Sequence, residues 1–176
     1  MKKDKKGNPM LKVLTVICML FAVSSDLFAY KEIVVDLSEQ RAYAIEDGVI
    51  IFDGPISTGV RGRETPEGQY TILQKKRYHK SNLWPKPNGG AKMNYMLRLT
   101  NSGIAMHLGY VPKKGPASHG CIRMKNGFAQ RMYAWAGVGT SVYVEGDIED
   151  WYAMHQRQRR QRNYAYDNDY FVVEGY

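Results

Sequence analysis

An Asp-Gly dipeptide between two apolar runs is the feature that most constrains the fold of this chain. Residues 41–46 alternate apolar and polar side chains over much of their length, and residues 49–52 are all apolar. Two such runs joined by Asp47-Gly48 predict a β-hairpin with a primed turn. Runs rich in β-branched and aromatic residues predict further strands at 31–36, 69–73, 95–99, 103–107 and 141–145. We therefore expect a mostly β domain.

Glycine and proline concentrate between these strands and predict loops at 54–55, 59–68 and 83–90. The last of these is a candidate lid or rim, and a structural loop is the alternative. A short helix is expected at about 127–135. Acidic residues at 147–150 and arginines at 157–162 favour a C-terminal helix with acids at its start and bases at its end.

The N-terminus has the features of an export signal. Residues 1–6 are basic, residues 11–23 are apolar apart from Lys12 and Thr15, and small residues lead to Ala29. This pattern predicts a secretory signal peptide over residues 1–29, and the apolar run is short for a membrane span. An uncleaved anchor is the alternative, because Leu27 is a poor residue three positions before a cut. We expect an exported protein, in the periplasm or associated with the cell wall.

The remaining chain divides into a domain at 30–146 and a helical, tyrosine-rich tail at 147–176. The formal net charge of the 176 residues is +8. Such a basic chain could bind nucleic acid, anionic lipid or an acidic polymer. Export and the absence of nucleic-acid-binding motifs argue against nucleic acid. The arginine cluster at 157–162 could contact an anionic envelope surface, or it could be a solvated helix end.

One cysteine, Cys121, remains once residues 1–29 are removed. An unpaired cysteine in a secreted protein suggests a reactive thiol or an intermolecular bridge, and a buried inert residue is the alternative. The flanking His119, Gly120 and Arg123 argue against an apolar pocket. A reactive thiol needs a base or a positive environment, and donors for the oxyanion that forms when it attacks an acyl carbonyl.

Two histidines are candidate bases. His107 ends an apolar run, and His119 lies two residues before Cys121, so the local sequence leaves the choice open. Gly120 permits close approach of a substrate, and Ser118 can brace the turn through its hydroxyl. Zinc binding by His79, His107, His119 and Cys121 is a weaker alternative, because no CxxC or HExxH spacing supports it.

The run 118–124, Ser-His-Gly-Cys-Ile-Arg-Met, together with His107, resembles the catalytic signature of the L,D-transpeptidases, the YkuD-type family. Segments 56–59, 64–68, 102–107 and 139–142 resemble other parts of that domain. The resemblance covers about residues 30–145. It implies a mostly β, two-sheet β-sandwich-like fold with one or two short helices, to which we add the C-terminal helical tail.

The resemblance also implies acyl transfer on peptidoglycan stem peptides through a thioester, with no metal or organic cofactor. Cys121 would be the nucleophile and His107 the general base, oriented by the carbonyl of Leu108. Further roles are assigned to an oxyanion and pocket set and to a substrate-binding set. The first comprises His119, Gly120 and Cys121 through their N–H groups, with Ser118 and Leu108, and the second comprises Arg123, Tyr95 and Gly103.

The expected reaction releases D-Ala from a tetrapeptide stem and passes the acyl group to an amine, forming a cell-wall cross-link. Water as acceptor would make an L,D-carboxypeptidase, and a lipoprotein lysine would make a ligase. A thiol peptidase acting on proteins and a non-catalytic wall-binding module are further alternatives. Many relatives have Gly directly after the first histidine where this chain has Leu108, and only ten residues separate His107 from Ser118. Both differences lie on the acceptor side of the site, so the identity of the acceptor stays open at this point.

Overall fold

The computed structural model describes residues 29–82, 89–113 and 115–173, with side chains as far as Arg162. The expected signal peptide and most of the candidate lid lie outside these residues. The strands are β1 (Lys31–Asp36), β2 (Arg41–Glu46), β3 (Val49–Ser57), β4 (Gly68–Thr71), β5 (Gln74–Lys76), β6 (Met96–Arg98), β7 (Ala105–Leu108), β8 (Ile122–Met124) and β9 (Ser141–Glu145). The described helices are α2 (Phe128–Trp135) and α3 (Ile148–Val173).

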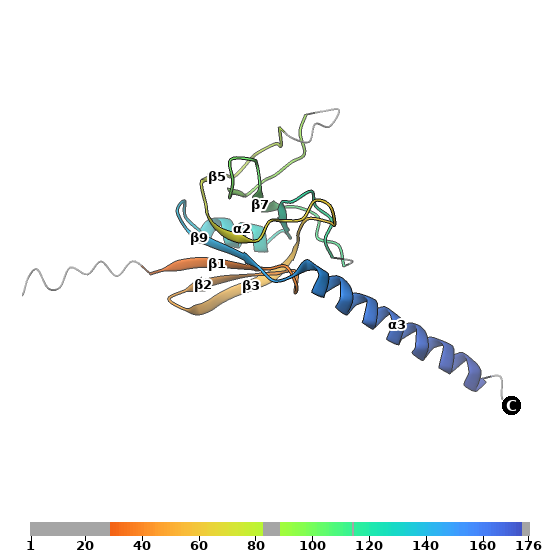
Figure 1. Cartoon of the computed structure of the whole chain (residues 1–176). Helices are drawn as coiled ribbons and strands as arrows, with labels where there is room; N and C mark the ends of the chain where they lie inside the picture. Colours follow the sequence, from red (N-terminus) through yellow and green to blue (C-terminus); the bar gives the residue numbers. More distant parts are fainter. Residues whose placement is uncertain (1–28, 83–88, 114, 174–176) are drawn as a thin grey trace, which may run out of the picture.

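The nine strands form one curled sheet in the order β4-β9-β1-β2-β3-β8-β7-β6-β5. Strand β3 belongs to both halves of this sheet. It pairs with β2 as far as Pro55, and with β8 through Ile56 and Ser57. The two sheets expected from the sequence are therefore two halves of one sheet that bends at β3 (Figure 1). The mostly β fold is confirmed.

The β2–β3 hairpin has the turn that its sequence predicts. Asp47 has φ 51° and Gly48 has φ 77°, which are the positive values that a primed turn requires. Glu46 pairs with Val49 across the turn.

Alternate residues of the central strands fill the main core. Ile33 and Val35 of β1 are fully buried, and β1 lies parallel to β9. Helix α2 covers this core with Ala129 and Met132. The ring of Phe52 meets the rings of Phe128 and Trp135 edge-on, at 6.1 Å and 5.6 Å between centroids.

The loop predicted at Gly54-Pro55 is wrong, because both residues lie inside β3. A Cβ at position 54 would lie 2.7 Å from the ring of Phe128, so glycine here makes room for α2 on the sheet. Pro55 pairs with Arg41, the first residue of β2, where the ladder ends and a missing N–H is tolerated.

Helix α3 is longer than the acid and arginine pattern suggested. It continues to Val173 and has no basic residue in its last turn, so the arginines at 157–162 lie in mid-helix rather than at its end. Its first turns belong to the domain, because Ile148 and Trp151 are buried in the main core. The core therefore extends beyond the boundary expected at residue 146. No helix in the described part of the chain is long and apolar enough to cross a membrane.

Candidate active site

The two faces of the parallel β7–β8 pair have different surroundings. Met106, Ile122 and Met124 point into the main core. Ala105 points to the other face, into a second cluster against which Cys121 packs. His107 pairs with Arg123, and side chains two residues apart on a strand share a face. His107 and Cys121 therefore lie on the same face, offset by two residues or about 7 Å along the strands.

His107 is held as a neutral imidazole. Its Nδ1 lies 2.8 Å from the carbonyl oxygen of Leu108. A carbonyl only accepts hydrogen bonds, so Nδ1 carries the hydrogen and Nε2 keeps its lone pair. Burial lowers the pKa of His107 to about 4, with the charges of Arg123 and His79 adding to this and the Leu108 bond opposing it. Near neutral pH the ring can accept a proton at Nε2.

The thiol of Cys121 is also held in its neutral form. Its Sγ lies 3.7 Å from the carbonyl oxygen of Gly103. Burial raises the pKa of the Cys121 thiol, while the N–H of Ala105 and the nearby charges of Arg123 and Arg98 act in the opposite direction. The site at rest therefore holds a thiol and an imidazole rather than a thiolate–imidazolium pair.

Ser118 braces the turn that carries the cysteine. Its hydroxyl donates to the carbonyl oxygen of Cys121 and accepts from the N–H of Gly120 at 3.1 Å. Gly120 has φ 104°, and a Cβ there would lie 3.0 Å from the side chain of Ile104, so position 120 requires glycine. The N–H of Gly120 is occupied by this bond. It therefore drops out of the three expected oxyanion donors in this conformation.

Thr65 holds the same turn from the opposite side. Its buried hydroxyl donates to the carbonyl oxygen of Gly120 at 2.9 Å and accepts from the N–H of Gly59 at 3.0 Å. In a trans peptide the C=O and the N–H point in opposite directions. Because the Gly120 carbonyl points at Thr65, the N–H of Cys121 points away from Thr65. The sequence contained Thr65 only as part of the 64–68 segment, with no role attached.

Two arginines flank the thiol without an ion-pair partner among the described residues. The stem of Arg123 lies along Gly109, where a Cβ would be 2.9 Å from its Cγ. Arg98 pairs with Ala105, and its Nε is buried with no hydrogen-bond partner in the part of the chain that the structure covers. Arg98 was not predicted, since a charged residue between Leu97 and Leu99 looks like the polar face of a strand. The site thus presents two cations to an incoming group.

The remaining expected site residues have the following surroundings. The ring of Tyr95 packs edge-on against Tyr133 at 5.7 Å and lies against the main core. Gly103 does reach the site, through the carbonyl that faces Sγ. His119 is exposed, whereas Cys121 is half-buried. Within residues 29–82, 89–113 and 115–173, no three His, Cys, Asp or Glu side chains gather as a metal site, so the zinc alternative finds no support there.

The family model of the L,D-transpeptidase catalytic domain (YkuD) matches residues 30–144. The chain therefore belongs to this family, as the motif around Cys121 suggested. A search of curated proteins gives no match.

Solved structures support the same assignment. An L,D-transpeptidase from Mycobacterium smegmatis is 26% identical with a TM-score of 0.59, over 66% of this chain and 59% of that one. An L,D-transpeptidase from Stackebrandtia nassauensis is 26% identical with a TM-score of 0.60, over 74% of this chain and 65% of that one. L,D-transpeptidase 3 from Mycobacterium tuberculosis, solved with a faropenem-derived adduct, is 25% identical with a TM-score of 0.58, over 66% and 60%. This chain thus spans less than two thirds of the length of these relatives.

Proposed function

We propose that this protein is a peptidoglycan L,D-transpeptidase that uses Cys121 as nucleophile and His107 as general base. The observation that carries the proposal is the tautomer of His107. Its Nδ1–H is committed to the Leu108 carbonyl, so Nε2 is free to take a proton on the face that holds the thiol. Membership of the family supports this reading.

The reaction follows from two neutral partners. As Sγ attacks the carbonyl carbon before the terminal D-Ala of a tetrapeptide stem, its proton passes to His107 Nε2. The N–H of Cys121, and that of His119, stabilise the oxyanion. The tetrahedral intermediate collapses to a thioester, and the departing amine of D-Ala takes the proton from His107. An acceptor amine then attacks the thioester, gives its proton to His107, and forms the cross-link as Sγ leaves and is reprotonated.

The charge of the site indicates the kind of donor that it binds. Arg98 and Arg123 have no described carboxylate partner, and the buried Nε of Arg98 has no hydrogen-bond partner among the described residues, so the pair favours an anionic ligand. Stem peptides carry carboxylates, so these two side chains are suited to hold the donor stem beside the thiol. Such a substrate places the enzyme outside the cytoplasm, in the periplasm or at the wall, consistent with the export signal in the sequence.

Incubation with purified disaccharide-tetrapeptides, followed by mass spectrometry, tests the proposal. We expect loss of D-Ala together with cross-linked dimers, and neither product with Cys121→Ala. Tripeptide without dimers would identify water as the acceptor and make the protein an L,D-carboxypeptidase.

Two further arms distinguish the remaining alternatives. A lysine-terminated lipoprotein peptide that becomes joined to the stem, in place of dimers, would indicate a ligase. Binding to isolated wall that is equal for wild type and Cys121→Ala, with no turnover by either, would favour a non-catalytic wall-binding module.

A further inference from the structure

Exposed apolar side chains gather at one end of the domain. Six of the nine large apolar side chains that are exposed in the described part of the chain lie there, and they are between 44% and 65% exposed. They are Tyr30, Val49, Ile50, Ile51, Leu73 and Val138. Three are consecutive at the tip of the β2–β3 hairpin, and isolated apolar residues scattered over a surface would not give this concentration.

The strand register places these residues at the same end. Strand β1 starts beside β9, because Glu32 pairs with Ser141, and it starts beside the hairpin turn, because Lys31 pairs with Glu46. The segment before β9 holds Val138. In Figure 1 this end lies on the left, where β1 begins and the hairpin turns, while α3 leaves the domain on the right.

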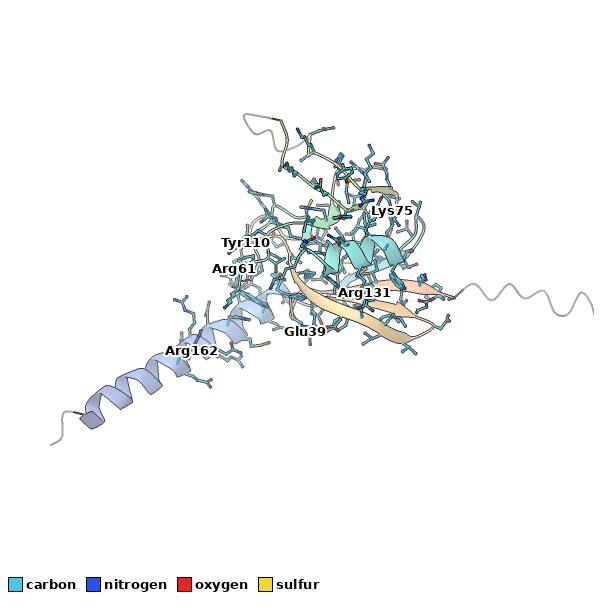
Figure 2. All side chains as sticks on the ribbon, turned by 180° about the vertical axis from the view of Figure 1, so that it is seen from behind. Glu39, Arg61, Lys75, Tyr110, Arg131 and Arg162 are labelled. Carbon is cyan, nitrogen blue, oxygen red and sulfur yellow. The ribbon has the colours of Figure 1, made fainter. Side chains whose placement is uncertain are left out.

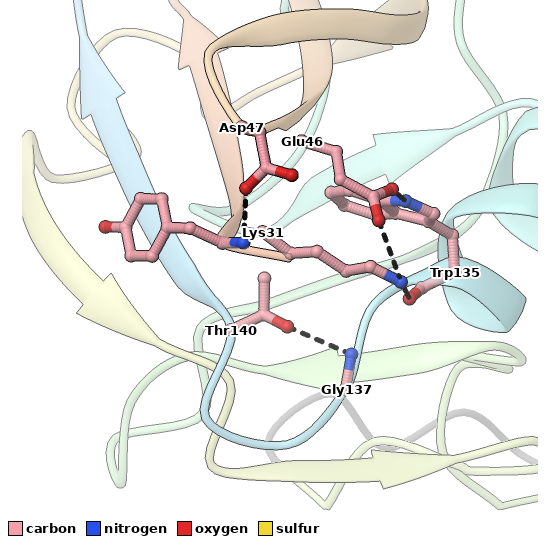
Figure 3. Close-up of polar contacts among 7 residues, drawn as sticks. Lys31, Glu46, Asp47, Trp135, Gly137 and Thr140 are labelled. Atoms are coloured by element: carbon pink, nitrogen blue, oxygen red, sulfur yellow. Dashed lines mark hydrogen bonds and ion pairs between the residues drawn. The ribbon is translucent and has the colours of Figure 1, made fainter. Parts of the chain in front are cut away.

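Hydrogen bonds fix this end as a unit. The N–H of Tyr30 donates to Asp47 Oδ1 at 2.8 Å, and the N–H of Asp47 donates to the carbonyl oxygen of Tyr30 at 2.9 Å. The indole N–H of Trp135 donates to Glu46 at 2.9 Å, and Lys31 bridges Glu46 and the carbonyl of Trp135 (Figure 3). Lys31 and Glu46 therefore offset one another's charge and the Asp47 carboxylate is bonded to the backbone, while the apolar side chains beside them are exposed.

The chain enters the domain at this same end. Tyr30 is preceded by six residues, 24–29, and these by the apolar run 11–23. A chain extends by at most about 3.6 Å per residue, so the seven residues from Val23 to Tyr30 can span at most about 25 Å. Any bilayer that the apolar run enters is thus within reach of the apolar end. A tyrosine beside aliphatic residues also suits the boundary between lipid and water.

We propose that, in the chain that retains residues 1–29 as an anchor, the apolar end formed by Tyr30, residues 49–51, Leu73 and Val138 rests on the lipid bilayer that the N-terminal apolar run occupies. The domain is then oriented with its hairpin tip in the lipid interface and α3 directed away from it. Contact depends on apolar burial rather than on anionic lipid, because Lys31 at this end is paired with Glu46.

Spin labels on the full chain test this orientation. Cys18→Ser and Cys121→Ser leave no other thiol, and a single label is then placed at Ile50→Cys or, as the matched control, at Met154→Cys on α3, where the native side chain is also about half exposed. The chain, with residues 1–29 retained, is reconstituted in phosphatidylcholine vesicles. Collisional accessibility is measured with oxygen, which concentrates in lipid, and with a water-soluble nickel chelate.

We expect the label at position 50 to be several-fold less accessible to nickel and more accessible to oxygen than the label at position 154. Replacing the Val49 and Ile51 side chains with Ser should restore nickel access at position 50. Equal nickel access at both positions would overturn the proposal. Dipolar broadening of the spectrum at position 50, without broadening at position 154, would also overturn the proposal. It would show that a second copy of this chain, rather than lipid, covers the apolar end.

Discussion

At the scale of single residues, burial sets the chemistry of the site. Burial disfavours the charged form of any group, so it lowers the pKa of His107 and raises that of Cys121. A pair tuned in this way keeps little thiolate at neutral pH, which limits oxidation of the thiol. In the proposed mechanism the proton is transferred only when a substrate carbonyl is in place.

This neutrality predicts a specific pH dependence of acylation. Protonation of His107 removes the base, so acylation by a carbapenem should stay constant from about pH 7 to about pH 5 and fall as the pH approaches the His107 pKa of about 4. His107→Asn should lower the rate by roughly 10²–10⁴-fold and abolish this acidic limb. The measurement is the rate of adduct formation, followed by intact mass.

The control for this prediction is His119→Asn, which should leave the acidic limb in place because His119 is exposed, whereas the buried His107 lies on the face of the sheet that holds the thiol. If folded His107→Asn is acylated at the wild-type rate and His119→Asn is not acylated, the general base is His119 instead.

Thr65 yields a second prediction at this scale. Thr65→Val keeps the shape of the side chain but leaves the Gly59 N–H and the Gly120 carbonyl without their partner. Each unsatisfied buried group costs about 1–3 kcal/mol of unfolding free energy. Because the Gly120–Cys121 peptide loses its fixed orientation, we also expect kcat to fall about 10-fold or more, the scale of a weakened oxyanion donor, with little change in KM.

Thr65→Ser keeps the hydroxyl and should restore kcat even if it restores stability only in part. A Thr65→Val enzyme that is less stable but has wild-type kcat at low temperature would limit Thr65 to a role in folding.

At the scale of elements, α3 belongs to two environments. Its first turns pack on the domain: Arg61 pairs with Glu149 and lies over the Tyr152 ring, and the Trp151 ring lies on Gly115, where a Cβ would be 2.1 Å away. Gly115 in turn precedes the Ser118 turn, and its carbonyl accepts from Ser57. Beyond these turns the helix extends away from the sheet, as the position of Arg162 shows (Figure 2).

We therefore predict different results from two truncations. Ending the chain after Gly146 removes Ile148 and Trp151 from the core and should lower the unfolding free energy by at least about 3–5 kcal/mol, the usual cost of removing one large aromatic side chain. Ending it after Arg162 should leave stability and muropeptide turnover within a few-fold of the full chain. Urea unfolding and product analysis measure both.

Trp151→Ala is the matched single substitution. It should lower the unfolding free energy by less than ending the chain after Gly146 does. If the chain ending at Gly146 proves as stable and active as the full chain, the sequence-based boundary at residue 146 is the functional one.

At the scale of the whole molecule, opposite ends carry different surfaces. The hairpin end exposes apolar side chains, whereas α3 carries Arg157, Arg159, Arg160 and Arg162, all exposed, with no acidic residue between positions 151 and 162. A domain resting on lipid by its hairpin tip would direct these arginines toward the wall. The arginine cluster is thus a candidate contact for an anionic envelope polymer.

Replacing these four arginines with Gln tests that contact. We expect binding to isolated wall sacculi to weaken and to lose most of its dependence on salt, because exposed charges act over a Debye length of about 8–10 Å that salt shortens. Turnover of a soluble muropeptide should not change. Unchanged, salt-dependent sedimentation of the variant with sacculi would exclude the cluster as the contact.

Elements whose signals are local could be predicted from the amino-acid sequence. The Asp47-Gly48 hairpin, β1, β9 and α2 follow from turn chemistry and side-chain periodicity, and the motif around Cys121 identified the family and the candidate nucleophile. Each of these depends on residues within a few positions of one another, so the chain order contains them directly.

Features that depend on the register between distant segments could not be predicted from the sequence and were found in the folded structure. Strands β5 and β8 are three residues long, too short for periodicity, and they exist because neighbouring strands offer unpaired backbone groups. Gly54 lies in a strand because the ring of Phe128 packs on it. Thr65 and Arg98 reach the cysteine turn from segments 56 and 23 residues away. Their roles come from hydrogen bonding and burial after the sheet has curled, and no local pattern records where a folded sheet brings its strands together.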